Sequence, residues 1–322
     1  MGLPPETVNR FRADLERLHD PAERLGVAVS GGPDSLALLL LAHAALGNHV
    51  FAATVDHGLR AESAAETRFV ADLCAKLGVR CEILTVKVAE GNLQAAARDA
   101  RYDALWAWAE RRALGSFATA HHADDQAETV MMRLNRGSGV AGLAGIRGSV
   151  RRPGSEVSLI RPLLSWRKRE LERVVEEAGI APVRDPSNAE DRFDRVRMRA
   201  ELLDADWIDP VAVSRSACHL AEADRLIDQM AFEELNANVE QTGSIIRYRP
   251  HGLGRVGGYR LVHARVVAML IERTGGTARG SEVQRLVDRL TVGDGGSLAG
   301  FVACALPGPV WELRPEPPRR SG

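Results

Sequence analysis

A glycine-rich stretch near the amino terminus has the residue types of a phosphate-binding loop. It follows an apolar run ending at Val29 and reads Ser30-Gly31-Gly32-Pro33-Asp34-Ser35. Glycines let backbone N–H groups approach an anion closely, and a helix that starts here would add its positive end. The two serines can donate hydroxyl hydrogen bonds, and the proline presets the first helical turn. The loop has neither the lysine of a Walker motif nor the spacing of a dinucleotide-binding fingerprint. The alternative to phosphate binding is a tight strand-to-helix turn capped by Asp34.

Paired carboxylates follow a later apolar run. The sequence there is Ala120-His121-His122-Ala123-Asp124-Asp125-Gln126-Ala127-Glu128. Asp125 and Glu128 are three residues apart, so one helical face can present both to a single cationic ligand. The alternative is a pair of charges that interacts with the dipole at a helix start. The two histidines could bind phosphate, or satisfy backbone carbonyls at the end of a strand.

The elements that must position these residues alternate between strands and helices. Short apolar runs predict strands, and stretches with apolar residues at helical spacing predict helices between them. The predicted strands are residues 25–30, 50–55, 80–86 and 116–119, and the predicted helices are residues 34–46, 62–77, 93–112 and 124–134. This alternation predicts an α/β fold with a parallel sheet covered by helices. Ligands bind beyond the carboxyl ends of such strands, where the loop and the carboxylates would lie.

A second, smaller domain is predicted towards the carboxyl terminus. The chain has 322 residues and is 45% hydrophobic, which is enough to bury the cores of two domains. A break near residues 204–210 precedes a helical stretch to about residue 238 and then short segments with glycine turns. We therefore expect a nucleotide-binding domain over residues 1–205 and a largely helical domain over residues 213–322. Trp106 and Trp108 are expected in the core of the first domain and at its flank.

Charge and cysteine usage narrow the class of protein. The formal net charge is -1, which argues against a polycation whose whole surface sits on phosphates. Residues 133–200 nevertheless carry 15 basic and 9 acidic side chains, a local excess that an RNA backbone could use. The four cysteines include no C-x-x-C pair, and no apolar run reaches the roughly 20 residues of a membrane span. We expect a cytoplasmic protein without membrane association, and a homodimer is left open.

Several further motifs occur in an order and spacing that point to a known family. They are Val55-Asp56-His57-Gly58-Leu59-Arg60, Arg98-Asp99-Ala100-Arg101-Tyr102, Arg136-Gly137-Ser138-Gly139, Arg161-Pro162-Leu163-Leu164, Asp185-Pro186-Ser187-Asn188 and the stretch from Arg195 to Arg199. With the glycine-rich loop and the stretch from His121 to Glu128, residues 22–205 resemble the tRNA(Ile)-lysidine synthetases, which are N-type ATP pyrophosphatases with a PP-loop. One departure is Val196, which stands where the family usually has asparagine.

The resemblance implies a fold like that of the adenine nucleotide α-hydrolases and a reaction on RNA. Members of the family use ATP to adenylate the C2 oxygen of the wobble cytidine in a tRNA(Ile) with a CAU anticodon, and free L-lysine then displaces AMP. The implied cofactors are therefore ATP and Mg²⁺. The glycine-rich loop would hold pyrophosphate, and Asp34 would be the carboxylate nearest to Mg²⁺. Asp56 and His57 would lie near the adenosine, or cap a turn.

The resemblance also implies a set of catalytic residues, which are Asp34, Arg101, Asp125, Glu128 and Arg199. Asp125 and Glu128 would bind the ammonium of the lysine substrate, although carboxylates raise an amine's pKa and the attacking amine must be neutral. The two arginines would bind phosphate charge or the RNA backbone, or be exposed helix residues. Family members use appended domains to choose their tRNA, so residues 213–322 would face RNA. Two other functions stay open: a thiolating PP-loop enzyme, against which the unpaired cysteines count, and an RNA-binding protein that binds ATP without turnover.

Overall fold

The chain forms two compact units, Met1–His219 and Leu220–Gly322. The computed structural model describes residues 2–56, 63–86, 93–183, 193–252 and 259–317. The division between the units falls within the long helix α9 (Pro210–Asn238), whose end agrees with the helical stretch predicted to about residue 238. The boundary predicted between residues 205 and 213 lies just before this helix or in its first turn.

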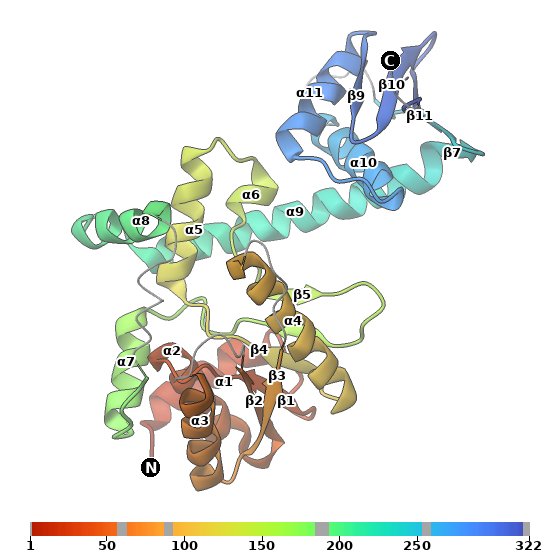
Figure 1. Cartoon of the computed structure of the whole chain (residues 1–322). Coiled ribbons are helices and arrows are strands. Elements are labelled where there is room, and N and C mark those ends of the chain that lie inside the picture. Colours follow the sequence, from red (N-terminus) through yellow and green to blue (C-terminus); the bar gives the residue numbers. More distant parts are fainter. Residues whose placement is uncertain (1, 57–62, 87–92, 184–192, 253–258, 318–322) are drawn as a thin grey trace. The chain divides into compact units, whose positions relative to one another are not determined.

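The first unit is built on a six-stranded sheet (Figure 1). The strand order is β3 (Arg80–Thr85), β2 (Val50–Asp56), β1 (Leu25–Ala28), β4 (Ser116–Ala118), β6 (Ser158–Ile160) and β5 (Ser149–Arg151). All neighbouring strands are parallel except β5, which is antiparallel to β6. The four predicted strands are thus confirmed as a parallel sheet. The chain leaves β1 towards β2 and β3 and returns on its other side at β4, so the switch point where such sheets bind ligands lies between β1 and β4.

Helices cover both faces of this sheet: α1 (Pro5–Glu16), α2 (Pro33–Leu46), α3 (Ser63–Leu77) and α7 (Lys168–Glu177) on one face and α4 (Leu93–Arg111) on the other. The other helices of the first unit lie away from the two faces (Figure 1); they are α5 (Ala123–Asn135), α6 (Val140–Leu143), α8 (Phe193–Asp204) and the start of α9. The four predicted helices between and after the strands are confirmed as α2, α3, α4 and α5. None of the helices in the described ranges is long and apolar enough to cross a membrane.

The core lies on the two faces of the sheet. On one face, α2 buries every residue from Ser35 to Ala42 and packs with α1, α7 and β1. A helix that is apolar all round needs such cover on all sides. On the other face, Trp106 and Trp108 of α4 are buried against β1 and β4, which confirms that both tryptophans are core residues.

The second unit contains a sheet that the sequence does not predict. Its antiparallel order is β7 (Val239–Thr242), β8 (Ile245–Tyr248), β11 (Val310–Pro315), β10 (Phe301–Leu306) and β9 (Gly295–Leu298). Two helices, α10 (Arg260–Arg273) and α11 (Gly280–Thr291), bury their apolar faces in the same core as this sheet. The predicted fold class, an α/β domain followed by a smaller domain with helices, is confirmed, but the smaller domain also holds this sheet. The sequence missed these strands because short strands with glycines carry too little periodicity to be recognised.

The tight packing of α4 against Gly26 of β1 yields a stability prediction. A Cβ on Gly26 would lie 2.7 Å from Trp108 Cζ3 and 2.9 Å from Leu114 Cδ1, whereas a Cβ on Gly148 would lie 3.6 Å from its nearest neighbour. We expect Gly26→Ala to lower the free energy of unfolding by about 1–3 kcal/mol through overpacking, and Gly148→Ala to be near neutral. Urea unfolding followed by tryptophan fluorescence measures both; equal losses would show that α4 does not pack on β1 this tightly.

Candidate active site

The glycine-rich loop connects β1 to α2 and is closed by one serine. Buried Ser35 accepts a hydrogen bond from the Ser30 N–H (3.1 Å), lies 3.1 Å from the Ser30 hydroxyl, and donates to the Gly32 carbonyl (3.0 Å). Gly31 has a φ of +86°, which a side chain would strain, and Gly32 precedes the first turn of α2. The loop therefore presents backbone and hydroxyl donors at the amino end of a helix, as an anion requires.

Asp34 lies on the first turn of α2 with one carboxylate oxygen unused. Its Oδ1 is buried and has no hydrogen-bond partner among the described residues. Its Oδ2 lies 3.7 Å from Nε2 of His122, which follows β4. A buried carboxylate oxygen without a partner costs free energy unless a ligand supplies one. Asp34 is thus positioned to accept a donor or a cation that none of the described residues provides.

His122 joins the glycine-rich loop to α5. It caps α5, because its Nδ1 accepts from the Asp125 N–H (3.3 Å) and its own N–H donates to Asp125 Oδ2 (3.2 Å). Its Nε2 lies 3.4 Å from the same carboxylate. Burial by itself would lower the pKa of His122, but the neighbouring carboxylates outweigh it and raise that pKa above its ordinary value. Burial is also the main cause of the raised pKa of Asp125.

Glu128, one turn further along α5, is buried and already paired. Arg199 of α8 donates to both of its oxygens, with Nε at 2.6 Å from Oε1 and Nη2 at 3.2 Å from Oε2. Arg195 lies 3.4 Å from Oε2. A buried carboxylate needs such compensation. The structure therefore brings Glu128 and Arg199 together and attaches α8 to α5 through them.

His121 has the opposite electrostatic surroundings to His122. Its Nδ1 lies 3.1 Å from the Thr119 hydroxyl. Burial, followed by the positive charges of nearby arginines, holds the pKa of His121 well below its ordinary value. Those arginines are Arg161, Arg98, Arg101 and Arg195. Arg101 thus lies in a group of guanidinium side chains around a neutral imidazole, which is an environment suited to a polyanion.

Of the remaining predicted residues, the structure describes Asp56 but not His57. Asp56, at the end of β2, accepts a hydrogen bond of 2.6 Å from the Ser63 hydroxyl at the start of α3, so it does serve to anchor a helix start. His57 and the motif from Asp185 to Asn188 lie outside the described residues.

Sequence reasoning missed how central two residues of this site are. The sequence leaves two roles open for His122, binding phosphate or satisfying backbone carbonyls at a strand end, and it gives Arg161 no role within its motif. The signal that could have found His122 is its position just after β4, at the switch point; Arg161 follows β6, a strand that the sequence does not predict.

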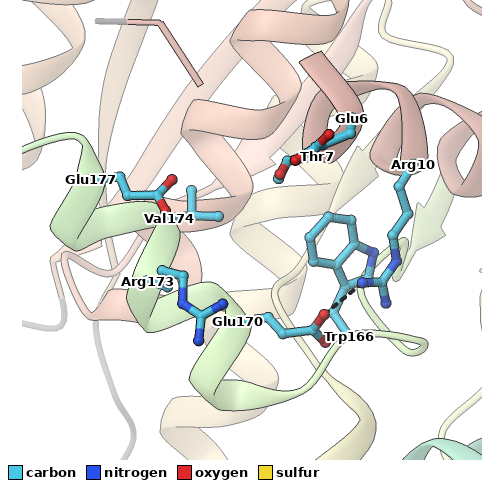
Figure 2. A pocket seen from close by; sticks show the side chains of 8 residues that line it. All are labelled: Glu6, Thr7, Arg10, Trp166, Glu170, Arg173, Val174 and Glu177. Carbon is cyan, nitrogen blue, oxygen red and sulfur yellow. Dashed lines mark hydrogen bonds and ion pairs between the residues drawn. The ribbon is translucent and has the colours of Figure 1, made fainter. Parts of the chain in front are cut away.

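A pocket of about 260 Å³ lies elsewhere in the first unit, between α1 and α7 (Figure 2). None of the predicted site residues lines it. Arg10 stacks over Trp166 at 4.1 Å and forms an ion pair with Glu170 at 2.6 Å. The charges of Arg10 and Glu170, which line the pocket, are thus paired with each other. We read this pocket as a helix contact and not as the reaction site.

Comparison with known proteins agrees with this geometry. Residues 6–206 match the PP-loop domain family, which is an ATP-binding domain class. Over 317 residues the chain is 46% identical to the tRNA(Ile)-lysidine synthase of Novosphingobium aromaticivorans, covering 97% of this chain and 95% of that protein. It is 40% identical over 303 residues to the tRNA(Ile)-lysidine synthase of Zymomonas mobilis, covering 92% and 90%. The chain therefore belongs to the tRNA(Ile)-lysidine synthase family, whose members are ligases that form a carbon–nitrogen bond, and the predicted resemblance is confirmed.

A solved structure shares the fold at lower similarity. The U34-tRNA thiolase NcsA from Methanococcus maripaludis superimposes with a TM-score of 0.56 at 20% identity, covering 69% of this chain and 78% of that one. Its identity is low, so this likeness concerns the fold of the PP-loop unit alone.

The central position of Ser35 in the loop yields a binding prediction. Ser35→Ala leaves the Ser30 N–H without an acceptor and releases the Gly32 carbonyl, so we expect about tenfold weaker ATP binding. Ser216→Ala, which removes an exposed hydroxyl on α9, should leave ATP binding unchanged. Isothermal titration calorimetry measures both affinities. Unchanged affinity in a folded Ser35→Ala variant would mean that the loop does not hold the phosphates.

Proposed function

We propose that this protein joins free L-lysine to C2 of the wobble cytidine in a tRNA(Ile) with a CAU anticodon, consuming ATP and releasing AMP and pyrophosphate. The observation that carries the proposal is the bridge of His122 between Asp34 and Asp125, at 3.7 and 3.4 Å. The loop to which we assign the phosphates and the carboxylates to which we assign the amine would thereby lie on either side of one imidazole. Successive adenylation and amine transfer need these two sites side by side.

The glycine-rich loop supports the first half-reaction. The cytidine C2 oxygen would bond to the α-phosphorus of ATP as the bond to pyrophosphate breaks, so the enzyme mainly has to hold the phosphates in line and stabilise the leaving group. The backbone of Gly31 and Gly32, the hydroxyl of Ser30 and the start of α2 supply donors for that purpose.

Asp34 is the residue that fits Mg²⁺. Its buried Oδ1 lacks a partner, while the described residues contain no group of three or more His, Cys, Asp or Glu side chains that could hold a metal. Such a site fits an ion bound by one carboxylate and by phosphate oxygens of the substrate, as Mg²⁺ often is. When bound, the ion would neutralise charge on those phosphates.

We assign the ammonium of the lysine substrate to Asp125 and Glu128. Since Glu128 is paired with Arg199 in the protein alone, the ammonium would take the place of that guanidinium. Arg199 would then bind the phosphate of the adenylated cytidine, where negative charge leaves with AMP. After losing a proton, the amine would form its bond to C2 as the bond between C2 and the AMP oxygen breaks.

The tRNA would lie on basic surface next to this site. Residues 133–200 carry 15 basic and 9 acidic side chains, and exposed arginines from three of its segments include Arg136, Arg151 and Arg197. Phosphate contacts of this kind position a nucleic acid without reading its sequence. We assign the anticodon stem to this region and selection of the tRNA to the second unit.

Analysis of nucleosides tests the proposed reaction. The purified protein, incubated with ATP, Mg²⁺, L-lysine and a tRNA(Ile) transcript with a CAU anticodon, should yield a nucleoside in which lysine is joined to cytidine, detected by mass spectrometry after digestion. The same transcript with the wobble cytidine changed to uridine should stay unmodified. ATP consumption without a mass increase on cytidine would contradict the proposal.

Two substitutions separate the half-reactions. Asp34→Asn should reduce pyrophosphate release by about 100-fold, because the carboxylate that faces the phosphates loses its charge. Asp125→Asn keeps an acceptor for the cap of α5, so pyrophosphate release should persist while the KM for lysine rises about tenfold. Asp72→Asn on the exposed side of α3 is the matched control. If both variants lost pyrophosphate release and lysine affinity equally, the division of roles would be wrong.

A further inference from the structure

Arg161 is a buried cation without a counter-ion among the residues that the structure describes. It follows β6 directly, next to the strand that leads to His121. Only 9% of the residue is exposed, and no carboxylate in the described part of the chain forms an ion pair with it. Nη1 donates to the Arg147 carbonyl at 2.6 Å, but Nε is buried without a hydrogen-bond partner. Burying an unpaired charge is expensive, so this arrangement calls for an anion.

Other cations lie around the same place. Arg98 and Arg101 of α4 lie 5.2 and 5.4 Å from the ring centre of Tyr102. Tyr102 adjoins Arg161 and offsets part of the effect of burial, which lowers the pKa of Arg161. The tyrosine hydroxyl and Arg161 Nε nevertheless both remain buried atoms without a hydrogen bond of acceptable geometry. Two unused donors and three guanidinium groups therefore share one site.

We propose that Arg161, with Arg98, Arg101 and the hydroxyl of Tyr102, forms a second phosphate-binding site, separate from the glycine-rich loop. The ligand is a phosphate group, supplied either by ATP or by the backbone of the RNA. A planar guanidinium whose Nε–H and Nη–H point the same way binds two phosphate oxygens at once. The neutral His121 adds no charge to this site and limits repulsion among the arginines.

If Arg161 had a purely structural role, that role would be its hydrogen bond to the Arg147 carbonyl. That bond uses Nη1 alone and gives no reason for a buried Nε–H without an acceptor. The structural role predicts that Arg161→Gln lowers thermal stability and leaves ligand affinities unaffected once the variant is folded. The phosphate site predicts a selective loss of affinity and a change in the salt dependence of binding.

The experiment compares Arg161→Gln, Arg161→Lys and the charge-matched control Arg68→Gln, an exposed position on α3. ATP binding is measured by calorimetry, tRNA(Ile) binding by filter retention at several salt concentrations, and lysine use from the KM. We expect Arg161→Gln to weaken either ATP or tRNA about tenfold or more relative to the control. Arg161→Lys should recover part of this loss. Weaker ATP binding identifies ATP as the source of the phosphate. Weaker tRNA binding with a salt slope reduced by about one identifies the RNA backbone.

Affinities for ATP and tRNA that match the control, or a change confined to lysine use, would overturn the proposal. If Arg161→Gln does not fold, crystals of the wild-type protein with a non-hydrolysable ATP analogue and with the anticodon stem-loop decide the matter. A phosphate oxygen on Arg161 Nε supports the site, and its absence with both ligands refutes it. The choice of RNA depends on the proposed function, so lysine transfer by the wild-type protein is assayed in parallel to tell the two failures apart.

Discussion

The arrangement of the site depends on the buried imidazole of His122 between carboxylates of two elements. Asp34 begins α2 after β1, and Asp125 begins α5 after β4, so the two helix starts flank the switch point of the sheet. Without a group between them, these carboxylates would repel each other in a partly buried space. The imidazole accepts the hydrogen bond that caps α5 through Nδ1, and its Nε2 lies between the two acids. It thereby sets the spacing between the phosphate loop and the residues proposed to hold the amine.

The negative and the positive side chains of the site surround two different histidines that are neighbours in the sequence. Carboxylates surround His122, and arginines surround His121. Where the two groups meet, Glu128 and Arg199 neutralise each other. Among the described residues of the site, the buried acceptor Asp34 Oδ1, the buried donor Arg161 Nε and the Tyr102 hydroxyl lack a hydrogen-bond partner. In the proposed reaction a cation and a phosphate group satisfy them, so substrate binding completes pairings that the protein alone leaves open.

Local patterns predicted the part of the fold that positions the site. Alternating apolar runs and helical periodicity were sufficient for β1 to β4 and α2 to α5, and a loop rich in glycine and serine directly after a strand marked the phosphate site. The strands β5 and β6 were missed because the glycine- and arginine-rich sequence over residues 136–162 interrupts the alternation of apolar runs. The bridging position of His122 and the unpaired state of Arg161 could not be read from spacing, because both depend on which strands lie side by side. The roles of Asp125 and Glu128 stay predictions, since only substrate can show what these carboxylates bind.

A crystal structure with a non-hydrolysable ATP analogue and L-lysine tests the central claim most directly, which is that substrates replace pairings within the protein. The account predicts the lysine ε-nitrogen within hydrogen-bond distance of Asp125 and Glu128, with the Arg199 guanidinium moved from Glu128 to a phosphate oxygen. Lysine bound elsewhere, with Arg199 still paired to Glu128 at the 2.6 Å seen here, would contradict it.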